Sequence, residues 1–177
     1  MDQREDIQSL GKPFAHRLIA LIESQLVTYR EYIPWADRVI KDSAEPPAWV
    51  IDLATVKYRP KAAKIARDFV NSEPVIDLPW DLWADEFIAA LFLRYERKEL
   101  SWASFLNDCG THTDAWELGR EPACEYFYAM LDVLEIADFS ASVEAKQRDE
   151  VSSQYGDVMA SVRRTYKAFK SFRVSAS

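Results

Sequence analysis

Glycine, cysteine and histidine are scarce in this chain of 177 residues, which holds four Gly, two Cys and two His. Ordinary usage would give about a dozen glycines, and chains that turn tightly between strands need more glycine than this. Two cysteines in a chain long enough to bury a large core do not form a disulfide framework, so we expect two reduced thiols. Most acid–base and metal sites that work at neutral pH use histidine, and two histidines are few for such a site.

The chain also lacks the signatures of common nucleotide-binding and hydrolytic sites. It has no G-x-G-x-x-G, no Walker lysine loop, no H-E-x-x-H and no G-x-S-x-G, so we expect no cofactor and no metal. The longest uncharged apolar run, residues 87–93, is far shorter than the roughly 20 residues that span a membrane. The first residues do not follow the basic-then-apolar order of a secretory signal. The sequence therefore favours a cytoplasmic protein.

The apolar periodicity is helical along nearly the whole chain, and a hydrophobic content of 49% supports a real core. We predict an all-α fold: one irregular bundle of about seven to eight helices, formed by residues 1–177 as a single domain, with frayed ends at 1–10 and 174–177. The predicted helices are 13–32, 35–41, 46–58, 60–71, 78–98, 102–109, 122–138 and 140 to about 170.

Local signals predict where these helices end and which sides they bury. Pro34 should break the first helix, and Gly110 should stop the helix that begins after Ser101. In the helix 78–98, Glu86 falls opposite the apolar stripe and should face solvent. The helix 122–138 is apolar on most sides, which predicts a central position in the fold.

Charge is distributed very unevenly along the chain. Residues 77–138 hold fourteen Asp/Glu and four Lys/Arg, a net charge of −10, whereas residues 1–76 sum to zero and residues 139–177 to +3. A surface of one sign attracts partners of the other sign. The overall charge of −7 speaks against binding to nucleic acid or to anionic membranes.

A strip of acids on the helix 122–138, with nearby aromatic residues, is the predicted partner-binding surface. Carboxylates would speed the encounter with a basic protein, and exposed aromatics would anchor it. The predicted binding residues are Trp116, Glu117, Glu121, Glu125, Tyr126 and Asp132. The last helix has a basic side (Arg163, Arg164, Lys167 and Lys170) that should lie near the acidic region and neutralise part of it.

The segment Asp108–Asp114 is the best local cluster of reactive residues. It is predicted to be a loop between helices, where Cys109 and His112 could act as a thiol and its base, or as metal ligands with Asp108 or Asp114. The segment lacks the second Cys/His pair of a zinc site. A structural role for this loop is therefore the favoured interpretation.

Three functional hypotheses remain open from the sequence. The favoured one is a non-catalytic acidic module that binds a basic protein, with the profile of an immunity protein or antitoxin that blocks a toxin nuclease. The second is a structural or adaptor subunit, which could be a homo-oligomer because of the high aromatic content. The third is a metal- or cysteine-dependent enzyme that uses Cys109 and His112.

Overall fold

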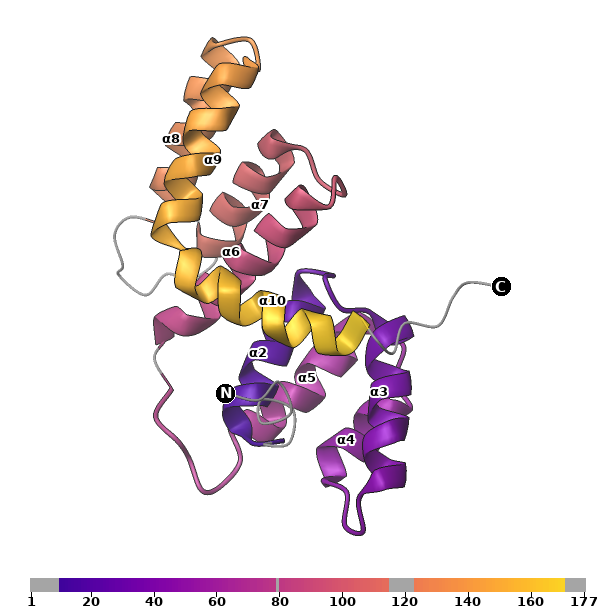
Figure 1. Ribbon diagram of the computed structural model, residues 1–177. Coiled ribbons are helices and arrows are strands. Elements are labelled where there is room, and N and C mark those ends of the chain that lie inside the picture. The colour runs from indigo at the N-terminus through magenta and orange to yellow at the C-terminus, as the bar shows by residue number, and fades with distance from the viewer. Residues whose placement is uncertain (1–9, 79, 115–122, 171–177) are drawn as a thin grey trace.

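The computed structural model of the protein describes residues 10–78, 80–114 and 123–170. Over these ranges it contains nine α-helices and no strand (Figure 1), which confirms the predicted all-α bundle. The helices are α2 (Lys12–Glu23), α3 (Tyr29–Asp42), α4 (Ala48–Ala54), α5 (Arg59–Val70), α6 (Trp80–Glu96), α7 (Trp102–Asp114), α8 (Ala123–Ile136), α9 (Ala141–Gln154) and α10 (Gly156–Lys170). None of these helices is both long enough and apolar enough to cross a membrane. The predicted frayed residues 1–9 and 174–177 lie outside the described ranges.

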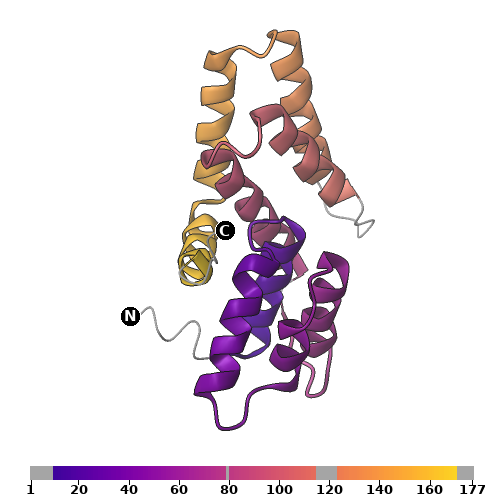
Figure 2. The ribbon, with the colours of Figure 1, turned by 90° about the vertical axis from the view of Figure 1, so that its right-hand side faces the viewer.

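Helices α6 and α10 join two groups of helices (Figures 1 and 2). The first group contains α2, α3, α4 and α5, and the second contains α7, α8 and α9. Helix α6 packs against α2 and α7, while α10 packs against α6 and also contacts α3 and α9. The α8–α9 hairpin extends from this body, and its turn lies at the far end of the molecule from α3 and α4.

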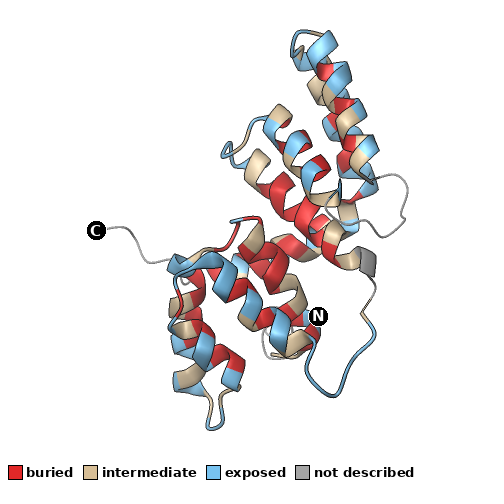
Figure 3. Cartoon of the chain, turned by 180° about the vertical axis from the view of Figure 1, so that it is seen from behind, coloured by how far each residue is buried: buried red, intermediate tan, exposed pale blue. Residues whose placement is uncertain are grey.

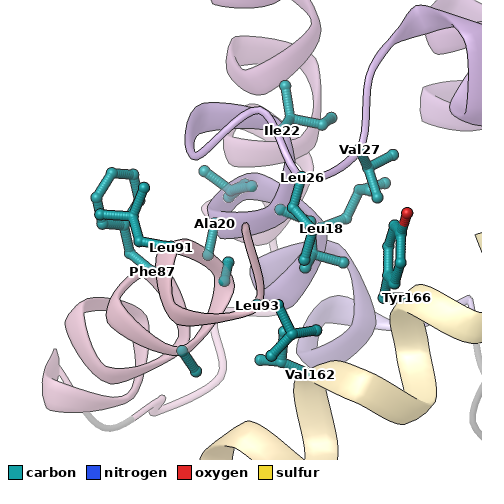
Figure 4. Close-up of a cluster of buried hydrophobic side chains, with 14 of the residues drawn as sticks. Leu18, Ala20, Ile22, Leu26, Val27, Phe87, Leu91, Leu93, Val162 and Tyr166 are labelled. Carbon is teal, nitrogen blue, oxygen red and sulfur yellow. The ribbon is translucent and has the colours of Figure 1, made fainter. Parts of the chain in front are cut away.

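The core where α2, α6 and α10 meet is mainly aliphatic, with a few aromatic side chains such as Tyr166 (Figure 4). Leu18 of α2 and Val162 of α10 are both completely buried, and Leu93 of α6, which lies beside Val162 in Figure 4, is 4% exposed. Full burial of each such side chain stabilises the fold by about 1.5–3 kcal/mol. These contacts connect the first and last of the described helices through the middle of the bundle.

The predicted first helix, 13–32, is wrong, because the chain turns at residues 24–28 and begins a new helix. Gln25 has a φ of 63°. Thr28 caps α3: its hydroxyl accepts from the Arg30 amide, while the Glu31 carboxylate accepts from the Thr28 amide at 2.9 Å. Because α3 begins after this capping box, Pro34 lies inside α3. The expectation that Pro34 breaks a helix is therefore wrong. The S/T-x-x-E signal at Thr28 marked this boundary in the sequence.

Glu86 is 1% exposed, so the expectation that it faces solvent is also wrong. Helix α6 is covered on several sides by its neighbours, and α2 supplies the partners of the carboxylate. Arg17 Nε donates to Glu86 at 2.9 Å, and His16 Nδ1 lies 3.2 Å from the other carboxylate oxygen. Arg17 also donates to Thr165 Oγ1 at 3.0 Å. A buried carboxylate needs such partners, because burial without them would cost several kcal/mol.

Helix α7 runs through Gly110 to Asp114, so Gly110 does not stop it. A Cβ atom on Gly110 would lie 2.5 Å from Cε1 of Tyr128. The missing side chain therefore lets α8 approach α7 closely, and this is one of the two most extensive pairs among the described helices. Gly110 serves packing here rather than helix termination.

Helix α8 is not central, contrary to the prediction. Its buried side chains, Phe127, Met130 and Leu134, follow the i, i+3, i+7 spacing of a helix that packs on one side only. Helix α6 is more deeply buried than α8, since every residue from 86 to 93 is buried. The predicted last helix, 140 to about 170, is two helices, α9 and α10, which divide at Tyr155 just before Gly156.

Candidate functional site

The predicted binding residues fall into two sets. Trp116, Glu117 and Glu121 lie outside the described residues. Glu125, Tyr126 and Asp132 are all on α8. The described part of the predicted surface is therefore carried by α8 alone.

Glu125 and Asp132 are exposed on α8, seven residues apart, so they lie on the same side of the helix. Tyr126 is half-buried, and its hydroxyl donates to Glu150 of α9 at 3.3 Å. Burial, together with the Glu150 carboxylate, raises the pKa of the Tyr126 hydroxyl far above its usual range. Tyr126 therefore faces α9, and the aromatic anchor that we expected from it is not on the outer side.

The outer side of α8 carries an apolar strip that the sequence reasoning missed. Ala129, Val133 and Ile136 have the i, i+4, i+7 spacing of one helix face, and all three are exposed. Val133 is 52% exposed and Ile136 is 87% exposed. In Figure 3 the outward-facing turns of this hairpin are largely exposed, up to the α8–α9 turn. The face has the apolar spacing of a helix that packs on a partner, but no described part of the chain covers it.

Phe139 extends this apolar strip into the α8–α9 turn. Its side chain is 56% exposed, and its φ is 56°, next to Asp138 with a φ of 51°. The left-handed region is uncommon for non-glycine residues and unfavourable for bulky ones. The turn is held by the Phe139 amide, which donates to the Leu134 carbonyl at 2.9 Å. The chain thus keeps a large apolar side chain at a position where neither burial nor backbone preference favours it.

Carboxylates border the strip along one side of α8, and no cation lies among them in sequence. Residues 123–139 contain four acids, Glu125, Asp132, Glu135 and Asp138, and no Lys or Arg. All four are exposed, and none of them takes part in the ion pairs found over the described ranges. We name this set, with Ala129, Val133, Ile136 and Phe139, the α8 surface.

The basic side of α10 pairs with α6. Arg163 forms an ion pair with Glu96 near the end of α6, and the Arg97 guanidinium lies 4.9 Å from the ring centroid of Tyr166. The apolar side of α10 docks on the core as predicted, with Val162 and Phe169 fully buried. The predicted neutralisation of the acidic region therefore holds for Glu96.

The hairpin that carries the α8 surface is held by a buried glutamine. Gln147 of α9 is 6% exposed; its Nε2 donates to the Met130 carbonyl at 2.7 Å, and its Oε1 accepts from Trp102 Nε1 at 2.8 Å. Each polar atom of the amide thus has a partner, which removes the cost of burying it. Helices α7, α8 and α9 are joined by this one side chain, so the orientation of α8 is determined by contacts on its inner side.

Cys109 and His112 lie on α7, not on the predicted loop. Cys109 is completely buried, and this burial raises the pKa of its thiol well above the usual value. Burial lowers the pKa of His112 to about 4, and its ring stacks on Phe87 with centroids 3.4 Å apart. A protonated, inaccessible thiol is a poor nucleophile. Within the described ranges, no three His, Cys, Asp or Glu side chains are grouped so that they could hold a metal.

Comparison of the chain with protein-family models, with curated proteins and with solved structures found no match.

Proposed function

We propose that the protein is a non-catalytic binding protein whose α8 surface docks a basic protein partner. The observation that carries this proposal is the exposed apolar strip of α8, bordered by four carboxylates without cationic partners in the described ion pairs. An apolar patch with polar and charged side chains at its edge is the usual composition of a protein interface. The acids would accelerate encounter with a cationic surface, and the apolar side chains would hold the complex.

Ile136 and Phe139 are the expected anchors, in place of the residues predicted from sequence. They are the two most exposed large apolar side chains of the α8 surface, and large side chains that become buried on binding dominate interface energies. The unfavourable φ of Phe139 supports a role in binding, because strained backbone at an exposed position gains no stability for the fold.

A basic partner is favoured over a second copy of the chain. A symmetric dimer through this face would place the same patch of both copies in contact, and the four acids of each copy would then meet their own equivalents. Like charges in such contacts cost several kcal/mol. Light scattering that shows a dimer, lost on Ile136→Ser, would favour the oligomer hypothesis instead.

The finer form of the proposal is inhibition: a partner that needs a cationic surface, such as a toxin nuclease, would lose activity when α8 covers that surface. This is the immunity-protein or antitoxin interpretation. It is tested by adding the purified protein to the partner and measuring nuclease activity. If the partner keeps its full nuclease activity when it is saturated with the protein, the protein binds the partner without inhibiting it.

The proposal is tested by measuring the rates at which the isolated partner associates with the protein and dissociates from it. The association rate should fall steeply from about 0.01 M to about 1 M salt, over which the Debye length falls from about 30 Å to about 3 Å. Ile136→Ser should weaken the Kd about 30-fold, corresponding to about 2 kcal/mol. Tyr58→Ser is the matched control, because Tyr58 is 70% exposed on the opposite group of helices. The proposal would be contradicted by a partner whose Kd weakens equally for both variants, or whose association rate does not depend on the salt concentration.

A further inference from the structure

A pocket of about 660 Å³ lies between α2, α5, the start of α6 and the segment 71–78. Its volume is within the range of about 300–1,000 Å³ that is usual for small-molecule sites. The pocket is at the opposite end of the molecule from the α8–α9 turn (Figure 1), so it is separate from the α8 surface. Most of its lining is apolar: Ile19, Val70, Val75, Ile76, Leu78 and Trp83.

The floor of the pocket is formed in advance by side chains that belong to the core. Ile19 of α2 is 3% exposed and Trp83 of α6 is 8% exposed. The indole of Trp83 contacts the rings of Phe87 and His112, with centroids 6.0 Å and 4.3 Å away. These contacts hold the indole in place, so a ligand that packs on it does not have to order it on binding.

The outer wall of the pocket is fastened to α2 by a buried lysine. Lys12 is 8% exposed, and its Nζ donates to the carbonyl oxygens of Ser72 and of Pro74, the latter at 2.7 Å. This wall carries Val75 and Ile76, which are 67% and 37% exposed. The pocket therefore has a fixed wall whose apolar side chains still have surface that a ligand can cover.

The charged groups around the pocket offer little compensation to a charged ligand. Arg67 is already paired with Glu23, so a ligand carboxylate would have to compete for this guanidinium. Asp77 is exposed and takes part in none of the ion pairs found over the described ranges, and pairing with an exposed carboxylate raises affinity by at most about fivefold. The Lys12 ammonium has only neutral carbonyl partners, and its charge is opposite to that of Asp77. The surroundings therefore favour neither sign of charge, while removal of an ion from water costs more than an exposed pair returns.

The polar side chains of the lining suit a neutral group that both donates and accepts hydrogen bonds. The amide of Asn71 has donors and an acceptor, Arg67 only donates, and the Asp77 carboxylate only accepts. The His16 ring lies 3.2 Å from the Glu86 carboxylate, so a counter-charge is already in place beside it. Donors and acceptors are thus both present at the pocket, and a hydroxyl or a primary amide finds a partner in either role.

We propose that this pocket binds an uncharged small molecule that combines an apolar body, about the size of a naphthalene ring, with one neutral hydrogen-bonding group. The body packs on Ile19 and Trp83 and is covered by Val75 and Ile76, while the polar group bonds to the amide of Asn71. An ammonium or a carboxylate on the same body loses its hydration without gaining a buried partner, so both charged forms are disfavoured. This inference does not depend on the function proposed for the α8 surface.

The test compares three probes that share a body and differ in charge. Naphthylethanol, naphthylethylamine and naphthylacetate of the same ring isomer are titrated into isotope-labelled protein, and the Kd is obtained from the NMR shifts of the amides that line the pocket. We expect the alcohol to bind with a Kd of about 1 mM or tighter, and each charged probe to bind at least about fivefold more weakly. The proposal is overturned if either charged probe binds as tightly as the alcohol, or if the Kd of the alcohol is weaker than about 1 mM.

A matched pair of variants locates the binding. Ile76→Ser removes apolar surface from the outer wall and should weaken the alcohol about fivefold or more. Ile51→Ser is the control, because Ile51 is 44% exposed on α4 and is not among the described residues that line the pocket; it should change the Kd by no more than about twofold. Both isoleucines are exposed, so neither substitution threatens the fold. Equal effects of the two variants on the Kd of the alcohol also overturn the proposal.

Asp77→Asn tests the argument from charge. The amine could pair with this exposed carboxylate, so its affinity should fall by no more than about fivefold. The affinity of the alcohol should stay within about twofold, because asparagine keeps an acceptor at the same position. A larger loss for the amine would show that the carboxylate selects a cationic ligand, which contradicts the proposal.

Discussion

The indole Nε1 of Trp102 donates to Gln147 Oε1 at 2.8 Å inside the second group of helices. Gln147 is one of the two residues of α9 that are buried, and α9 has little else to attach it to α7. The hydrogen bonds of this amide therefore fix the position of the α8–α9 hairpin relative to α7. The α8 surface has its position because the inner side of the hairpin is fixed in this way.

Gln147→Leu should destabilise the fold by about 2–3 kcal/mol, because it leaves the Trp102 indole and the Met130 carbonyl buried without partners. Urea denaturation measures the change in the free energy of unfolding. Gln154→Leu, at an exposed position near the end of the same helix, should change stability by no more than about 0.5 kcal/mol. A similar loss in both variants would show that the buried amide has no special role.

Gly110→Ala should cost about 1–3 kcal/mol although alanine is the better helix former, because the new Cβ would lie 2.5 Å from the Tyr128 ring. Gly156→Ala is the matched control, since a Cβ there would have no neighbour within 4 Å, and it should be neutral or stabilising. In a Tyr128→Ala background the penalty at Gly110 should disappear. If Gly110→Ala still destabilises the fold in the Tyr128→Ala background, the new Cβ does not act through a clash with Tyr128.

Helical periodicity predicted the fold class and several helices, but not which neighbour covers each side. α5 and α6 could be located from Pro60 and from the apolar pattern after Leu78, because both signals are local. The burial of Glu86 depends on Arg17, which is 69 residues away, and no local pattern contains it. The S/T-x-x-E signal at Thr28, by contrast, is local, and it marks the start of α3 in the sequence itself.

The candidate site was predictable only in part, for the same reason. The acids Glu125 and Asp132 were correctly placed on one side of a helix, since helix geometry alone determines that. Val133 was assigned to a helix apolar on most sides, and its exposure became evident only when α8 proved to pack on one side. Which apolar residues are left for a partner is a property of tertiary packing.

His112 should make the fold sensitive to acid. Its pKa is about 4 in the folded chain because of burial, against about 6.5 in the unfolded chain. The unfolded state therefore binds the proton more readily, and stability falls as the pH falls from about 6.5 towards about 4. The loss should be about 2 kcal/mol after allowance for solvent screening of a partly exposed ring.

His112→Phe preserves a ring against Phe87 and Trp83 but cannot take up a proton. Urea denaturation of both proteins between pH 4 and pH 7 should show a shallower decline of stability in the variant. Tm values over the same range give an independent readout. Parallel curves for the two proteins would mean that other groups account for the acid sensitivity.

Phe139→Asn should separate stability from binding. Asparagine tolerates a positive φ better than phenylalanine does. Relief of the backbone strain at the φ of 56° should therefore raise the free energy of unfolding by about 1 kcal/mol. Lys98→Asn is the control, because Lys98 has a φ of 60° and is exposed away from the α8 surface. Both variants should raise the Tm, but only Phe139→Asn should weaken partner binding. If neither affects binding, Phe139 is not an anchor, and the proposed contact would have to rest on Ile136 and Val133 alone.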